Sequence, residues 1–134
     1  MNDINRTSIG NSALQQKRKI GFLASRKIAT LSVLPTLDWA TEISQREDIA
    51  VVSGFHSQME KEVLKILLRG RCGIIVVLAR GMYRKVPKPY EEALQQNRLL
   101  ILTYEKDNVT RVSEQTAHKR NTYVISLSDE LKQI

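Results

Sequence analysis

CGIIVVL, at residues 72–78, is the stretch of sequence that decides the fold. It contains no polar side chain and is rich in β-branched residues, which favour extended strands. A strand that is apolar throughout is typical of a parallel sheet whose two faces are both covered by helices. The segment therefore predicts a central strand of an α/β fold.

Strand-like and helix-like segments alternate on both sides of this stretch. Further apolar segments at 19–24, 49–52 and 98–103 are expected to be strands, and helical spacing of apolar residues is found at 35–46, 57–68, 89–97 and 113–127. Such alternation requires right-handed crossover connections. The sequence therefore predicts an α/β protein with a Rossmann-like open, mainly parallel sheet of four to five strands and helices on both faces.

Length and composition limit the organisation of the chain. Its 134 residues supply one core, so 17–134 are expected to form a single domain, and the polar residues 1–16 are expected to form a flexible N-terminal tail. Cys72 is the only cysteine, which excludes an internal disulfide and a thiolate-rich metal site. No apolar run approaches the roughly 18 to 20 residues that span a bilayer, so we expect a cytoplasmic protein with no membrane partner.

Two segments carry the positive charge. The formal net charge is +7, yet 1–30 contain six basic residues against one acidic residue, and 67–90 contain six basic residues and no acidic one. Ligands of parallel α/β sheets bind beyond the carboxyl ends of the strands, where loops lead into helices. The loops after the first three predicted strands hold the candidate phosphate-binding residues Ser25, Arg26, Lys27, Ser53, Gly54, His56, Arg80, Gly81, Arg84 and Lys85. They predict a site for phosphate or nucleic acid at this edge of the sheet.

Residues 19–129, which include these loops, resemble the DNA-processing protein family called DprA or Smf. The residues that carry the resemblance are Ala24-Ser25-Arg26-Lys27, Val52-Ser53-Gly54, Leu78-Ala79-Arg80-Gly81, Val86-Pro87, Arg120-Asn121 and Leu127-Ser128. The resemblance implies a Rossmann-like core that binds single-stranded DNA and hands it to a recombinase of the RecA type. At matching positions, Arg26, Ser53, Gly54, Arg120 and Asn121 are the first candidates for DNA contact. The chain departs from the family at 57–60, where Ser-Gln-Met-Glu replaces Arg-Gly-Ile-Asp, and at Leu64, where the family has a histidine.

Ser57 and Glu60 have two interpretations. Their spacing is that of a capping box, in which the serine accepts from the backbone and the glutamate reaches back. The other interpretation is an acidic contact with the ligand, as the family's aspartate implies.

The sequence carries poor enzyme signatures. It has no glycine-rich dinucleotide loop, no Gly-Lys-Ser or Gly-Lys-Thr phosphate loop, and no cluster of His and Cys at metal-ligand spacing. We therefore expect neither an enzyme, nor a cofactor, nor a metal. Two alternatives to DNA binding stay open, namely a sensor module that binds a nucleotide or small phosphorylated ligand at Ser53 and Gly54, and an interaction domain that forms a homodimer.

Overall fold

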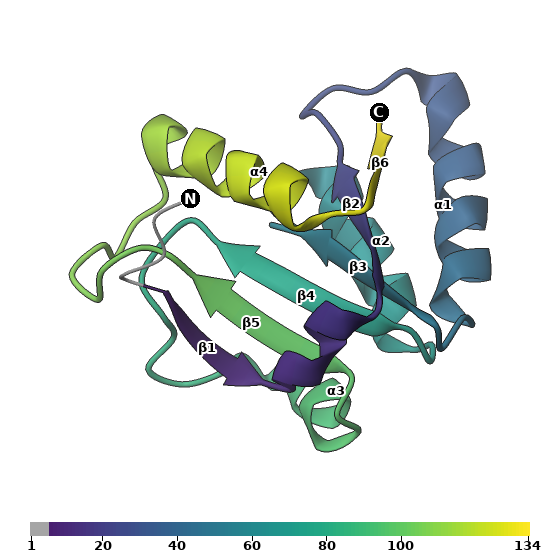
Figure 1. Ribbon diagram of the computed structural model, residues 1–134. Coiled ribbons are helices and arrows are strands. Elements are labelled where there is room, and N and C mark those ends of the chain that lie inside the picture. The colour runs from purple at the N-terminus through teal and green to yellow at the C-terminus, as the bar shows by residue number, and fades with distance from the viewer. Residues whose placement is uncertain (1–5) are drawn as a thin grey trace.

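The apolar stretch at 72–78 forms the buried strand β4 (Gly73–Leu78) in a six-stranded sheet (Figure 1). The computed structural model describes residues 6–134. The other strands are β1 (Thr7–Gly10), β2 (Arg18–Leu23), β3 (Ile49–Ser53), β5 (Leu99–Thr103) and β6 (Glu130–Gln133), in the order β1-β5-β4-β3-β2-β6. Only β1, antiparallel to β5, departs from the parallel arrangement. The predicted Rossmann-like, mainly parallel sheet is confirmed.

The sheet has more strands than the four to five that we predicted. The additional strands β1 and β6 lie at the two edges, and most of their residues are exposed. Edge strands of this kind need no continuous apolar run, because one side of the strand and much of each face contact solvent. Their pairing is therefore not visible in apolar periodicity.

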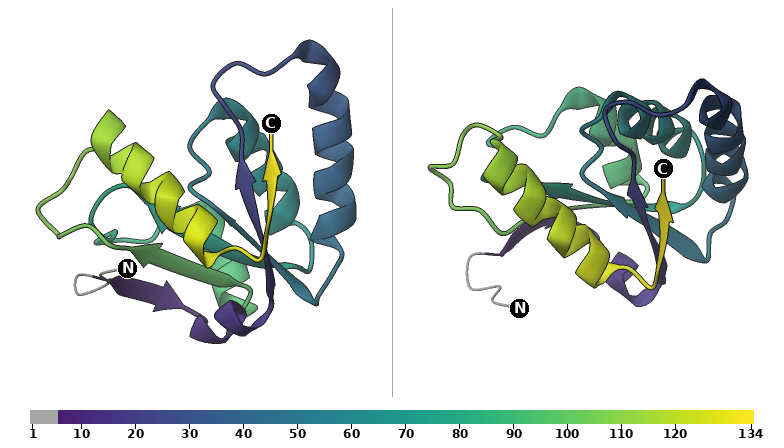
Figure 2. Two further views of the ribbon diagram at one scale, coloured as in Figure 1. Left: turned by 45° about the horizontal axis from the view of Figure 1, so that its top comes forward. Right: turned by 90° about the horizontal axis from the view of Figure 1, so that it is seen from above.

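Helices cover both faces of the sheet, as predicted (Figure 2). The helices are α1 (Thr30–Ser44), α2 (Gln58–Leu68), α3 (Glu91–Gln95) and α4 (Glu114–Leu127), with 3-10 turns η1 (Ser12–Gln16) and η2 (Lys88–Tyr90). Buried side chains of α1, α2 and α3 share one core cluster with Ile74 and Val76. Buried side chains of α4 and η1 share the other with Ile75 and Val77, so successive residues of β4 serve opposite faces.

The prediction of a flexible N-terminal tail is wrong for residues 7–16, which form β1 and η1. Residues 1–5 lie outside the described part of the chain. Ile9 of β1 pairs with Ile101 of β5. Leu14 is only 2% exposed and belongs to the core cluster on the face of the sheet that α4 covers. Gly10 has a φ of 108°, a conformation that favours glycine, where the chain turns from β1 towards η1. Backbone pairing and one buried leucine hold this segment, and neither is apparent from its polar composition.

Helix α1 begins at Thr30, five residues before the predicted start at Pro35. A proline in a helix removes one N–H and restricts the preceding residue, which is why we placed the boundary there. Here the helix runs through Pro35, and Thr36 donates its hydroxyl to the Ser32 carbonyl at 2.7 Å within this same stretch. The first turns of α1 are exposed, with Leu31 at 89% and Leu34 at 71%.

Arg98, which precedes β5, completes the hydrogen bonding at the carboxyl end of α2. Its Nη1 donates to the carbonyls of Leu67 (3.3 Å) and Cys72 (2.8 Å), and its Nη2 donates to the carbonyl of Leu68 (2.8 Å). The last carbonyls of a helix have no partner within the helix, and a cation also stabilises that end of the helix dipole. Arg98 is therefore a structural cation and does not belong to the phosphate site predicted at the carboxyl ends of the strands.

Replacing Arg98 by alanine is expected to lower the free energy of unfolding by about 2 kcal/mol, because three carbonyls lose a charged donor. Urea titration followed by circular dichroism measures this change. The matched control is Arg71→Ala, whose exposed side chain makes no hydrogen bond or ion pair with residues 6–134. An equal loss in both variants would contradict the structural role.

Candidate functional site

Glu60 joins two loops at the carboxyl edge of the sheet. Its buried carboxylate accepts hydrogen bonds from the backbone N–H groups of Ala24 (3.0 Å, Oε2), His56 (2.8 Å, Oε1) and Ser57 (3.2 Å, Oε1). Ala24 belongs to the loop after β2, and His56 and Ser57 belong to the loop after β3. The Ser57 hydroxyl accepts from the Glu60 N–H at 3.3 Å, so the capping box is confirmed. The second loop is thereby fixed to the first.

Arg120 of α4 lies over the loop that Glu60 holds. The residue is only 6% exposed, and its Nε donates to Asn121 Oδ1 at 2.8 Å. A Cβ at Gly54 would lie 2.5 Å from both Cδ and Cζ of Arg120, so the guanidinium rests directly on the glycine backbone. Within residues 6–134, its two terminal nitrogens make no hydrogen bond or ion pair.

The charge of Arg120 is therefore largely buried without a salt-bridge partner. Burial lowers the pKa of Arg120, and the nearby Glu60 carboxylate acts in the opposite direction. An arginine stays protonated in proteins, so the residue is a cation whose terminal N–H groups are available to a ligand. Such an arrangement favours an anion with two acceptor oxygens, such as a phosphate.

Two cavities meet at Arg120. The first, of about 450 Å³, lies between the loops after β2 and β3 and helix α4, and the predicted residues that line it are Ser25, Arg26, His56, Arg120 and Asn121. The second, of about 300 Å³, lies between the loops after β3 and β4, and the predicted residues that line it are Gly54, His56, Arg80 and Arg120. We call the two together the basic cleft. The structure thus brings seven of the twelve predicted residues together, from four separate segments.

The other five predicted residues lie outside the cavities. Lys27, Arg84 and Lys85 are exposed beside them. Ser53 is buried and its hydroxyl accepts from the Phe55 N–H at 3.0 Å. Gly81 donates its N–H to the Val109 carbonyl at 2.8 Å and lies so close to Lys106 that a Cβ would be 2.5 Å from the Lys106 carbonyl oxygen. Ser53 and Gly81 thus stabilise the conformation of these loops and do not line a cavity.

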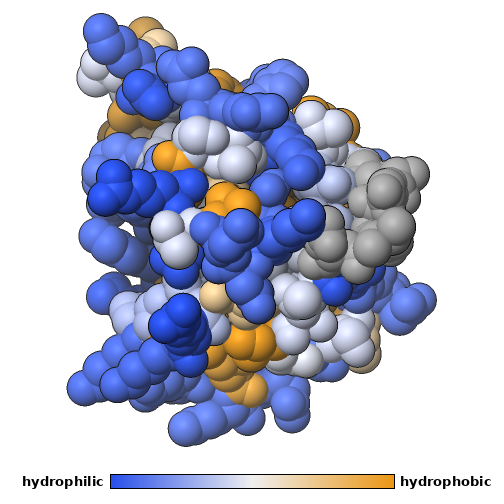
Figure 3. Space-filling model, turned by 90° about the vertical axis from the view of Figure 1, so that its left-hand side faces the viewer, coloured by the Kyte–Doolittle hydropathy of each residue, from blue (hydrophilic) through white to orange (hydrophobic). Residues whose placement is uncertain are grey.

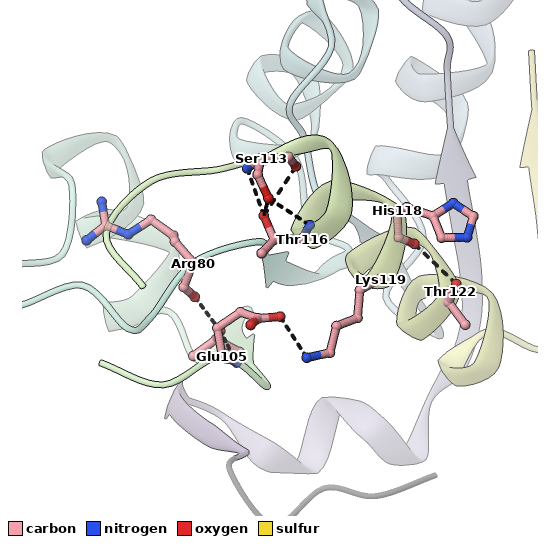
Figure 4. Close-up of polar contacts among 8 residues, drawn as sticks. Arg80, Glu105, Ser113, Thr116, His118, Lys119 and Thr122 are labelled. Atoms are coloured by element: carbon pink, nitrogen blue, oxygen red, sulfur yellow. Dashed lines mark hydrogen bonds and ion pairs between the residues drawn. The ribbon is translucent and has the colours of Figure 1, made fainter. Parts of the chain in front are cut away.

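The start of α4 and the residues just before it also line the first cavity, and sequence reasoning missed them. Val112, Ser113 and Glu114 line the cavity, and Ser113 begins α4 with a capping box to Thr116 (Figure 4). The box uses threonine where the usual pattern has glutamate or glutamine, so the motif gave a weak signal. An ion pair between Lys119 and Glu105 at 3.2 Å joins α4 to the segment just after β5.

Arg80 is held at the mouth of the second cavity. Its guanidinium lies 5.2 Å from the centre of the Tyr83 ring, and its Nε donates to the Gly81 carbonyl at 3.1 Å. Figure 4 shows its side chain extending away from Lys119 and Glu105. Figure 3 shows the side of the molecule towards which the carboxyl ends of β4 and β5 point. Hydrophilic side chains cover most of this side. Arg80 is therefore placed to add a third cation to the basic cleft, beside Arg26 and Arg120.

Neither a metal centre nor a membrane span is evident in the described chain. Among residues 6–134, no group of three or more His, Cys, Asp and Glu side chains could hold a metal ion. Over the same range, no helix is long and apolar enough to cross a bilayer. Cys72 is fully buried, and burial raises the pKa of its thiol to about 11, so the reactive thiolate is disfavoured.

The sheet topology and the cleft at its carboxyl edge define a Rossmann-like domain with a basic loop cluster. A family model described as DNA recombination-mediator protein A matches residues 7–132, and the chain belongs to this family. No curated protein matches the sequence.

Two solved structures share this fold. DNA processing protein A from Helicobacter pylori, in a structure described as giving insight into its single-stranded DNA binding mode, has a TM-score of 0.75 at 18% identity, over 99% of this chain and 61% of that one. DNA processing protein A (DprA) from Streptococcus pneumoniae has a TM-score of 0.74 at 15% identity, over 96% of this chain and 45% of that one. The chain thus spans about half the length of these similar proteins.

Proposed function

We propose that this recombination-mediator domain binds single-stranded DNA through backbone phosphates in the basic cleft. The observation that carries the proposal is the buried Arg120 guanidinium, which rests on Gly54 at the junction of the two cavities. The relative from Helicobacter pylori, which is described as binding single-stranded DNA, supports the same ligand class. Handover of the DNA to a recombinase of the RecA type, and a homodimer, are proposals that family membership alone supports.

The shape of the basic cleft favours an oligomer over a single nucleotide. Arg26 lines only the first cavity, Arg80 lines only the second, and Arg120 lines both. Three cations spread over two connected cavities can contact successive phosphates of one strand. A sensor for one phosphorylated ligand needs only one of the cavities, and that alternative is an outcome of the experiment below.

The experiment compares oligothymidine binding by the double variant Arg26→Ala, Arg80→Ala with binding by the unchanged protein. We expect affinity to fall at least about tenfold, and the salt dependence to weaken by roughly 0.7 in log–log slope for each lost phosphate contact. The matched control is the double variant Arg46→Ala, Arg71→Ala. It removes two exposed cations near the amino ends of β3 and β4, at the opposite end of the strands from the basic cleft.

Three results would contradict the proposal. They are no binding at low salt, an equal loss in the control variant, and thermal stabilisation by a mononucleotide but not by oligothymidine. The last result would favour the sensor alternative.

DNA binding is expected to tighten as pH falls through the titration of His56. Burial, then Arg120, Lys61 and Arg26, lower the pKa of this histidine from its ordinary value of 6.5, so it is mostly neutral at pH 7 in the unliganded protein. A bound phosphate raises that pKa, and the complex then takes up a proton. Affinity measured between about pH 7.5 and 5.5 should rise more steeply for the unchanged protein than for His56→Gln.

The titration of His56 affects folding in the opposite direction, because it lowers the free energy of unfolding as pH falls. Because the folded-state pKa of His56 is lower than the unfolded value, the unfolded chain binds the proton more readily as pH falls below about 6.5. The contribution of His56 is therefore fully present above that pH and is lost as pH falls through the folded pKa. Identical pH profiles for His56→Gln and the unchanged protein would contradict both statements.

A further inference from the structure

A third cavity, outside the basic cleft, lies between α2 and the segment that forms η2. Its volume is about 280 Å³, and its apolar lining residues are Leu64, Leu68, Pro87, Pro89 and Tyr90. We call it the apolar groove. It adjoins the second cavity, with which it shares Lys61, Leu64 and Tyr90.

Exposed lysines border the apolar groove. Lys61 and Lys65 of α2 are exposed on its border, and Lys65 also contacts Glu62 at 3.2 Å. Lys88, which lies in the sequence between the lining residues Pro87 and Pro89, is exposed as well. An apolar lining with a cationic border complements a ligand that has apolar side chains flanked by carboxylates.

We propose that the apolar groove binds an acidic peptide segment of a partner protein, anchored by leucine or aromatic side chains. The lining removes such side chains from water, which supplies the affinity, while the lysines attract and orient the neighbouring Asp or Glu side chains. Lysine suits this role, since its ammonium is a mobile point charge on a long stem. The proposal does not depend on DNA binding in the basic cleft.

The chemistry of the apolar groove favours a peptide over a nucleic acid. Pro87 and Pro89 have no backbone N–H to offer a phosphate. Tyr90 is only 8% exposed, so its ring face is largely covered and cannot serve as a stacking platform for a base. Arg120 and Gly54, which form the anion-binding arrangement, are both absent from its lining.

The test is selection of binders from a random peptide library on the full chain. Selected peptides are expected to be enriched in Asp and Glu beside Leu or aromatic residues. Their affinity should fall about tenfold or more in Lys65→Glu and in Pro89→Asp, both at exposed positions that line neither cavity of the basic cleft. The control Arg71→Glu, in the loop between α2 and β4 and outside the lining of the groove, should bind the peptides unchanged.

Three outcomes would overturn the proposal. They are selection of no peptide or of peptides without acidic enrichment, equal binding by Pro89→Asp, and loss of peptide binding in Arg26→Ala, Arg80→Ala but not in Lys65→Glu. The last would place the peptides in the basic cleft. Oligothymidine binding by Lys65→Glu and Pro89→Asp should stay within about twofold of the unchanged protein, which separates this proposal from DNA binding.

Discussion

Glu60→Ala is expected to lower the free energy of unfolding by about 3 kcal/mol and to weaken oligothymidine binding. Three backbone N–H groups, at Ala24, His56 and Ser57, lose their acceptor. Unsatisfied donors at buried or half-buried positions each cost roughly 1 kcal/mol or more, and the capping box is lost as well. The two loops are then no longer joined, so the cations of the basic cleft lose their fixed positions. Chemical denaturation measures the first effect, and fluorescence anisotropy with labelled oligothymidine measures the second.

Two variants make this prediction specific. Glu62→Ala removes a carboxylate of the same helix whose hydrogen bonds and ion pairs among the described residues are with Gln58 and Lys65 alone. It should change stability by less than about 0.5 kcal/mol. Glu60→Gln keeps one acceptor oxygen and should lie between the unchanged protein and Glu60→Ala. Equal stabilities of the Glu60→Ala and Glu62→Ala proteins would contradict the role of Glu60.

Gly54→Ala is expected to weaken oligothymidine binding at least about tenfold while changing stability little. The new methyl group would occupy the space of the Arg120 guanidinium, which must move away from the junction of the cavities. The movement costs the fold little, because the displaced atoms are the far end of a flexible side chain. Anisotropy titration and thermal unfolding of the same preparation separate the two effects.

A double-mutant cycle assigns this loss to Arg120. If Gly54→Ala acts by displacing the guanidinium, then Gly54→Ala combined with Arg120→Ala should bind no more weakly than Arg120→Ala alone. Additive losses would show that Gly54 contributes to binding through its own backbone, and the packing argument would be wrong.

The central strands of the fold were predictable, because their apolar segments are continuous. The four predicted strands match β2, β3, β4 and β5 to within about one residue at each end. Strands β1 and β6 were not predictable, since backbone pairing at an edge leaves no apolar pattern in the sequence.

The candidate site was predictable only in part. Topology alone places the loops after β2, β3 and β4 at one edge, and so brings Arg26 and Arg80 to the same edge of the sheet. The exposed positions of Lys27, Arg84 and Lys85 depend on the course of each loop, which charge does not reveal. The burial of Arg120 over Gly54 arises from packing of α4 across the sheet, a contact between residues far apart in the sequence.

The central claim is that one strand of DNA contacts the basic cleft around Arg120. Backbone amide chemical shifts, followed by NMR while oligothymidine is added at low salt, test it most directly. The largest changes are expected at Gly54, His56 and Asn121, with none at Lys17 or Glu47 on the opposite edge of the sheet. Changes confined to the opposite edge or to the apolar groove, or no changes at all, would contradict the account.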